Sequence, residues 1–197
     1  MPRICNAVRI VILCPLLTLP VSSAGQRAAN WYGDFSPCGR RFELLKRQSM
    51  RLGVKISTSN PELAREFRSA MNFWARVLDM DWHEDPSSSC ALQLVDGSPE
   101  ILKTRIVARA QFIEWDNFQG WIAFNPRTAL SNAEMYLTAV HEIGHMFGLK
   151  HNPNVKSIMY YLDLQSSEML DRSDLAALAA HHKLRIGSLR APIPVHL

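Results

Sequence analysis

Long apolar runs, cysteines and net charge are all scarce in this sequence, and each scarcity excludes a class of protein. The apolar run Ile10–Leu19 covers only ten residues, whereas a membrane-spanning helix needs about 20. Because this run is too short, we expect no membrane span. The formal net charge is +4, with Lys and Arg scattered along 197 residues, so we expect no nucleic-acid partner. No repeat or low-complexity tract indicates a fibre or a disordered chain. The length and the ordinary composition are typical of one globular domain.

Residues 1–24 have the features of a secretory signal peptide. Two arginines precede the short apolar run, and small residues follow it up to Ala24. We therefore predict cleavage after Ala24 and a secreted product, extracellular or periplasmic, whose residues 25–197 form a single, monomeric domain. Because the lost segment holds two Arg and no acidic residue, the formal net charge falls from +4 to +2.

Cleavage would also remove two of the four cysteines and leave Cys38 and Cys90. Two thiols in an oxidising compartment most simply form one disulfide. We therefore predict a bridge between Cys38 and Cys90.

The first half of the mature chain predicts a strand and an amphipathic helix. Arg51–Ser57 alternates roughly and favours a strand. Asn60 followed by Pro61 is typical of a helix start. The helix is expected to run from Pro61 to about Leu78, with one apolar face made of Leu63, Phe67, Ala70, Met71, Trp74, Val77 and Leu78.

Further along, the pattern predicts three strands and then two helices. The strands are expected at Ala91–Val95, Arg105–Phe112 and Trp121–Phe124. A capping box of Ser131 and Glu134 opens a helix that reaches Phe147, where Gly148 ends it, and Asp171–Leu184 predicts a C-terminal helix. This order indicates an α+β fold with a mixed sheet and helices packed against it.

The segment His141–His151 indicates a metal site. Residues four apart share a face of a helix, so His141 and His145 can direct two imidazoles at one ion. Glu142 lies beside them without being a ligand, and Gly148 can turn the chain so that His151 arrives as the third ligand. Three protein ligands leave one position open, which is typical of a catalytic zinc site. The other four histidines are expected to be solvated or structural.

This eleven-residue motif resembles that of the metzincin zinc metallopeptidases, which also have a methionine-containing turn beneath the metal. Met159, in Ser157–Tyr161, stands at a spacing similar to that of the matrixins, the matrix metalloproteinase family. The resemblance implies a zincin fold: a twisted mixed sheet of about five strands, three helices and a short C-terminal subdomain after the zinc motif. It also implies that Val107, Ala108, Arg109 and Ala110 form the edge strand that binds substrate.

The resemblance implies a secreted zinc endopeptidase that cleaves protein or peptide substrates, with Glu142 as general base and one catalytic Zn²⁺. Calcium is possible, but the calcium-binding loops of the vertebrate matrixins are not evident in the sequence. Two other functions remain open: a non-catalytic secreted zinc-binding domain, and a zinc hydrolase of a non-peptide amide.

Two further expectations rest on the resemblance. Tyr161 stands two positions after Met159, where astacins and serralysins have a tyrosine that approaches the zinc and stabilises the oxyanion. The alternative is that Tyr161 packs beneath the site. Cys38-Gly39 is similar to the Cys-Gly of the matrixin cysteine switch, which gives Cys38 an alternative role as an inhibitory zinc ligand.

Overall fold

The computed structural model describes residues 50–87, 91–97, 106–114, 119–160, 169–185 and 192–195. The predicted signal peptide, both cysteines of the predicted bridge and Tyr161 lie outside these residues.

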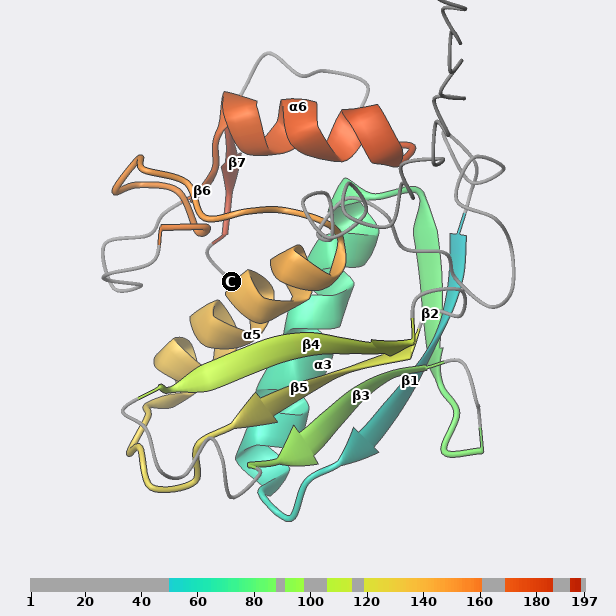
Figure 1. Ribbon diagram of the computed structural model, residues 1–197, viewed down its shortest axis with the longest axis vertical. Helices are drawn as coiled ribbons and strands as arrows, with labels where there is room; N and C mark the ends of the chain where they lie inside the picture. Colours follow the sequence, from blue (N-terminus) through green and yellow to red (C-terminus); the bar gives the residue numbers. More distant parts are fainter. Residues whose placement is uncertain are drawn as a thin grey trace, which may run out of the picture.

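Five strands form one mixed sheet in the order β2-β1-β3-β5-β4 (Figure 1). They are β1 (Met50–Ser57), β2 (Met80–Glu84), β3 (Ala91–Asp96), β4 (Ala108–Glu114) and β5 (Gln119–Phe124). The first three strands and β5 run parallel, whereas β4 pairs antiparallel with β5. Among the described strands, β4 therefore forms one edge of the sheet.

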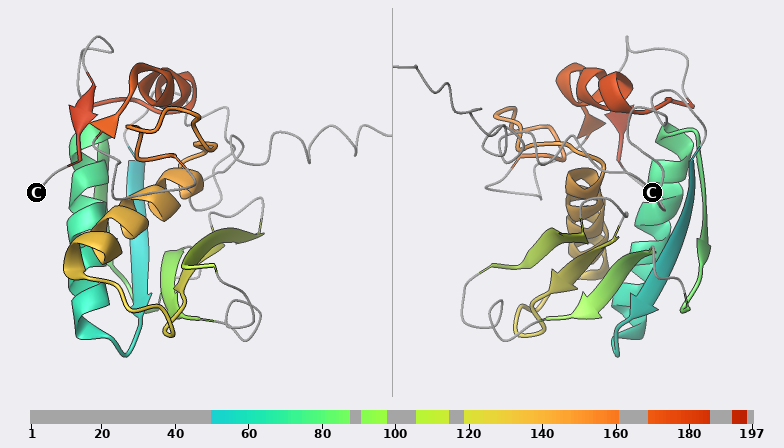
Figure 2. Two further views of the ribbon diagram at one scale, coloured as in Figure 1. Left: turned by 90° about the vertical axis from the view of Figure 1, so that its left-hand side faces the viewer. Right: turned by 45° about the vertical axis from the view of Figure 1, so that its right-hand side comes forward.

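Two helices, α3 (Pro61–Val77) and α5 (Asn132–Met146), cover the same face of this sheet (Figure 2). A third helix, α6 (Arg172–His181), lies at the top of Figure 1, beyond the end of α5. Beside α6, β6 (Met169–Leu170) and β7 (Ile193–Pro194) pair antiparallel in a second, two-stranded sheet. Among the helices that the structure describes, none combines the length and the apolarity needed to span a membrane.

Helix α3 forms where its sequence signals predict it. The Asn60 side chain accepts hydrogen bonds from the backbone N–H groups of Glu62 and Leu63, at 3.0 and 3.1 Å, which satisfies donors that a helix start otherwise leaves unpaired. Every residue of the predicted apolar face is buried: Leu63, Phe67, Ala70, Met71, Trp74, Val77 and Leu78. Burial of this face against α5 and the sheet supplies most of the stability of such a helix.

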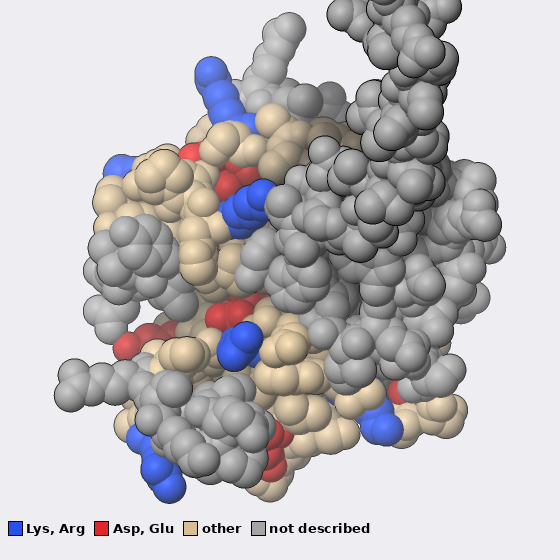
Figure 3. Space-filling view, in the orientation of Figure 1, with Lys and Arg blue, Asp and Glu red and all other residues tan. Residues whose placement is uncertain are grey.

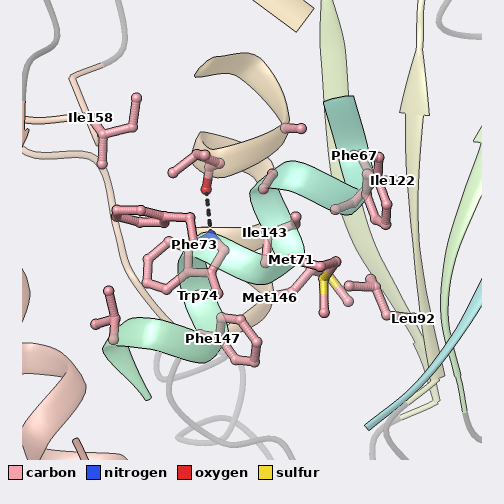
Figure 4. Packing of buried hydrophobic residues seen from close by; sticks show 14 of the residues in the cluster. Phe67, Met71, Phe73, Trp74, Leu92, Ile122, Ile143, Met146, Phe147 and Ile158 are labelled. Atoms are coloured by element: carbon pink, nitrogen blue, oxygen red, sulfur yellow. Dashed lines mark hydrogen bonds between the residues drawn. The ribbon is translucent and has the colours of Figure 1, made fainter. Parts of the chain in front are cut away.

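The hydrophobic core is centred on the contact between α3 and α5, where Trp74 is completely buried (Figure 4). Its ring centroid lies 5.4 Å from that of Phe73 and 5.4 Å from that of Phe147. The indole N–H donates to the backbone oxygen of Val140 at 3.1 Å, so the one polar atom of this large side chain is satisfied. Trp74 thus fixes α3 against the segment of α5 that leads into His141.

The structure confirms the α+β fold, but the bounds of several elements differ from the sequence predictions. Helix α6 ends at His181 instead of Leu184, and β5 begins at Gln119 instead of Trp121. Strand β2 was not predicted, and its five residues pair with β1. Strand β4 begins at Ala108 instead of Arg105, and Ile106 precedes it with 43% of its surface exposed, so the apolar face of the strand starts later than the alternation indicates. The short pair β6 and β7 was also not predicted.

Candidate metal centre

Helix α5 presents two histidines from one buried face. The predicted capping box is confirmed: the backbone N–H of Glu134 donates to Ser131 Oγ, and the Glu134 carboxylate accepts from the Ser131 backbone N–H at 2.7 Å. Three turns later, His141 and His145 are only 6% and 7% exposed. Because both belong to a helix held by α3 and the sheet, their positions are fixed before any metal binds.

The chain turns sharply at Gly148 after the helix ends. Gly148 has φ 89°, a left-handed conformation that glycine adopts without the strain of a Cβ atom. Its N–H donates to the His145 carbonyl at 3.0 Å, and the N–H of Leu149 donates to the Gly144 carbonyl at 3.0 Å. These two bonds form a Schellman motif. The turn brings His151 back towards the two helical histidines, as the sequence predicts.

Three imidazole nitrogens converge at this point. The Nε2 atom of His145 lies 3.1 Å from that of His141 and 3.2 Å from that of His151. The ligand atoms of the three residues all lie within 4.8 Å of one another. Nitrogens bound at 2.0–2.1 Å to one tetrahedral zinc are roughly 3.3 Å apart, so the observed spacing fits such an ion.

The opposite nitrogen of each helical histidine fixes its tautomer. His141 Nδ1 lies 2.6 Å from the carbonyl oxygen of Ile158, and His145 Nδ1 lies 2.7 Å from that of Leu149. A carbonyl can only accept, so both Nδ1 atoms must donate, and both Nε2 atoms of the neutral rings carry lone pairs. Lone pairs at 3.1 Å repel each other unless a cation lies between them. The donor set therefore fits a metal.

Burial keeps these rings neutral. It lowers the pKa of His141 to about 3 and that of His145 to about 4, and the neighbouring imidazoles add to the effect. The more exposed His151 also has a lowered pKa because of partial burial. Neutral imidazole is the form that binds metal, so all three side chains are ready to do so near pH 7.

Glu142 lies next to the first histidine and is only 8% exposed. Burial raises the pKa of its carboxyl to about 7, although a hydrogen bond from the backbone N–H of Ala110 and the positive charge of Arg109 both lower it. Because Ala110 belongs to β4, the same contact joins α5 to the edge strand. A carboxyl held in this way can take up and release a proton near neutral pH.

The turn around Met159 lies beneath the histidines. Met159 is fully buried, and a Cβ atom at Gly144 would come within 2.7 Å of its Sδ atom. The carbonyl that orients His141 belongs to Ile158, in the same turn. The turn therefore supports α5 from below and also aligns one candidate ligand.

The remaining histidines and the predicted edge strand have different positions. His83 is exposed on β2, whereas His182 is buried and its Nε2 lies 2.9 Å from the carbonyl oxygen of Phe147. Ala108, Arg109 and Ala110 belong to β4, and Val107 directly precedes it, accepting a hydrogen bond from the Asn125 N–H at 2.8 Å. The side chain of Arg109 is exposed.

Sequence reasoning missed the polar contacts behind the third histidine. Asn152 is 7% exposed, and its amide reaches the first residues of α6. The signal was slight: Asn152 stands where matrixins usually have serine, but its partners come from a distant part of the chain.

The described part of the face in Figure 3 shows single Lys and Arg side chains with Asp and Glu between them, and no continuous cationic surface.

Comparison with known proteins agrees with this geometry. The sequence matches the family model of the matrixins over residues 51–182. It is 30% identical over 149 residues to matrix metalloproteinase-21 of Xenopus laevis, covering 69% of this chain and 25% of the relative. It is 27% identical over 154 residues to matrix metalloproteinase-21 of Cynops pyrrhogaster, covering 69% of this chain and 24% of the relative. This chain thus spans about a quarter of the length of these curated relatives, and it belongs to the matrixin family.

Proposed function

We propose that this protein is a secreted zinc-dependent endopeptidase. The observation that carries the proposal is the convergence of three neutral histidine nitrogens beside a buried glutamate. His141, His145 and His151 would hold the metal, and three protein ligands leave a position open for water or substrate. Membership of the matrixin family supports zinc as the metal and peptides as the substrates.

Glu142 is the proposed general base. It takes a proton from the attacking water and then passes that proton to the nitrogen of the leaving amine as the peptide bond breaks. The Ala110 N–H holds the carboxylate on the side of the site that faces the edge strand. Zinc bound by the three histidines would supply the Lewis acid that acidifies water and polarises the peptide carbonyl.

The edge strand β4 is the proposed binding surface for an extended substrate. Its inner side pairs with β5, and a peptide can add to the free side of an edge strand through backbone hydrogen bonds. The contact between Ala110 and Glu142 places this edge directly beside the proposed base. This arrangement favours cleavage inside a chain over removal of terminal residues.

A peptide-library assay on the purified full chain, with and without a chelator, tests the function. We expect internal cleavage of peptides that stops on zinc removal and returns on zinc addition. Glu142→Ala should retain one zinc per chain and lose at least about 10²-fold in kcat/KM, the lower range for loss of a general base. Glu62→Ala, on the exposed side of α3, is the matched control and should keep full activity.

A second set of variants separates metal binding from catalysis. His151→Ala should weaken zinc binding itself, whereas His83→Ala should leave zinc binding unchanged because His83 is exposed on β2. Undiminished turnover in Glu142→Ala would refute the mechanism. Zinc binding without any peptide cleavage would favour a non-catalytic zinc-binding domain. Cleavage of non-peptide amides alone would favour a zinc hydrolase of such amides.

A further inference from the structure

Asn152, the residue after the third candidate ligand, uses its side chain to join two distant segments. Its Nδ2 atom lies 3.0 Å from Asp171 Oδ2, 3.0 Å from Ser173 Oγ and 2.9 Å from Asp174 Oδ1. Its Oδ1 atom accepts from the backbone N–H of Asn154 at 2.9 Å. The Oδ1 contact forms a local turn, which is an ordinary use of asparagine. The Nδ2 contacts are different because their partners lie 19 to 22 residues further along the chain.

Those partners form the N-terminal cap of α6. Asp171 is the N-cap residue, and its carboxylate accepts from the backbone N–H groups of Ser173 and Asp174 at 2.8 and 3.0 Å. In return the Asp174 carboxylate accepts from the Asp171 N–H at 3.1 Å. This reciprocal capping box fixes both carboxylates whether or not Asn152 is present. The amide therefore docks on a preformed acceptor site.

The same cap also holds the turn beneath the metal centre. Ser157 Oγ donates to Asp174 Oδ2 at 2.6 Å and accepts from the Met159 N–H at 2.9 Å. The backbone N–H of Asn152 donates to the Met159 carbonyl at 2.9 Å. Ile158, between these residues, orients His141. The cap of α6 thus connects to the loop of one candidate ligand and to the carbonyl that aligns another.

We propose that Asn152 is a positioning residue that couples the cap of α6 to the placement of His151. This rests on the proposed zinc site. His151 follows the Gly148 turn and lies outside regular structure, and it is the most exposed of the three ligands. Without the amide link, the loop has more alternative conformations, and fewer of them present the imidazole to the metal. Outer contacts that orient ligands change metal affinity by about 10–100-fold.

Zinc affinity of the full chain, measured by chelator competition, tests the link. Asn152→Asp keeps the acceptor of the local turn but replaces the donor with a third carboxylate. We expect zinc binding to weaken by about 10–100-fold and the visible absorption of the Co²⁺-substituted protein to change. Asn154→Asp is the matched control, because exposed Asn154 also donates to Asp171, at 3.0 Å, but lies further from His151. It should change affinity by less than about threefold.

A swapped pair supplies the rescue. Asn152→Asp combined with Asp174→Asn restores one donor and one acceptor across the same contact, and it should recover most of the affinity and the Co²⁺ spectrum. A folded Asn152→Asp variant with wild-type zinc affinity would overturn the inference while leaving the zinc site intact. If that variant does not fold, Asn152→Ala, which also removes the donor, replaces it, with the same expected loss and the same contrary result. A wild-type chain that binds no zinc would instead refute the proposed function and this inference together.

Discussion

The buried imidazole of His182 shows how one side chain can link the stability of the fold to pH. Burial lowers its pKa to about 4, and the hydrogen bond to the Phe147 carbonyl only partly offsets this effect. An unfolded histidine has a pKa of about 6.5. Between these two values the unfolded chain binds more protons than the native chain, so the free energy of unfolding falls as the pH decreases from about 6.5 to about 4.

We therefore predict that His182→Gln reduces this acid destabilisation. Glutamine can still donate to the Phe147 carbonyl, but it does not titrate. Between pH 7 and pH 4.5 the variant should lose about 2 kcal/mol less unfolding free energy than the wild type, as measured by denaturant titration in excess zinc. His83→Gln, at an exposed position on β2, should follow the wild type. Parallel pH curves for all three proteins would contradict the buried-imidazole explanation.

Tyr161, which lies outside the described residues, is the second residue whose substitution has a specific expected effect. If its phenol donates to the oxyanion, Tyr161→Phe should lower kcat by about 10²–10³-fold with little change in zinc content. Tyr160→Phe should have a much smaller effect. Steady-state kinetics and metal analysis of the two variants decide the point, because equal small effects would leave Tyr161 as a packing residue.

At the scale of elements, α5 is held in place by the side chains that pack against it. Its candidate ligands face the site, while Gly144 on the same helix lets Met159 and Trp74 approach closely. A Cβ atom at Gly144 would come within 2.7 Å of Met159 Sδ and 3.1 Å of a ring carbon of Trp74. The helix, the methionine turn and α3 therefore form one packed unit.

Gly144→Ala should disturb this unit. Overpacking costs about 1–3 kcal/mol, and the higher helix propensity of alanine offsets about 1 kcal/mol of it, so we expect a modest net loss of stability together with weaker zinc binding. Thermal unfolding and chelator competition measure the two effects. In a Met159→Ala background the substitution should cost less, because the clashing side chain is gone. An identical loss of stability in both backgrounds would exclude the Met159 contact as its cause.

Local signals explain which elements could be predicted from the sequence. Asn60, Pro61 and the capping box of Ser131 act within one turn of a helix, so α3 and α5 could be placed from the chain alone. Strand β2 could not, since it has five residues of mixed burial and depends on pairing with β1. The two residues each of β6 and β7 form a strand pair only because the fold brings them together.

The candidate site also combines local features that the sequence predicts with tertiary contacts that it does not predict. The spacing of His141, His145 and His151 is local, so their convergence could be predicted from a helix followed by a turn. The Ile158 carbonyl that orients His141, the Ala110 contact to Glu142 and the partners of Asn152 are tertiary contacts. No periodicity or spacing in the sequence specifies them.

At the scale of the whole molecule, the predicted bridge between Cys38 and Cys90 would tie the N-terminal region to the residue directly before β3. Both cysteines lie outside the described residues. A disulfide that closes a loop of this size should contribute about 4 kcal/mol by the chain-entropy estimate, so reduction should lower the melting temperature. Mass spectrometry of the non-reduced protein checks the prediction. Two free thiols would exclude the bridge, and activation by mercurial reagents would instead support the cysteine-switch alternative.

The burial of Trp74 has a spectroscopic consequence. An indole enclosed by Phe73, Phe147 and the Val140 carbonyl should emit at shorter wavelength than the partly exposed Trp82 and Trp121. Because Val140 directly precedes His141, a paramagnetic or coloured ion at the histidines should quench this blue-shifted component. The fluorescence of the chain can therefore report occupancy of the centre in real time, without a substrate and without a label.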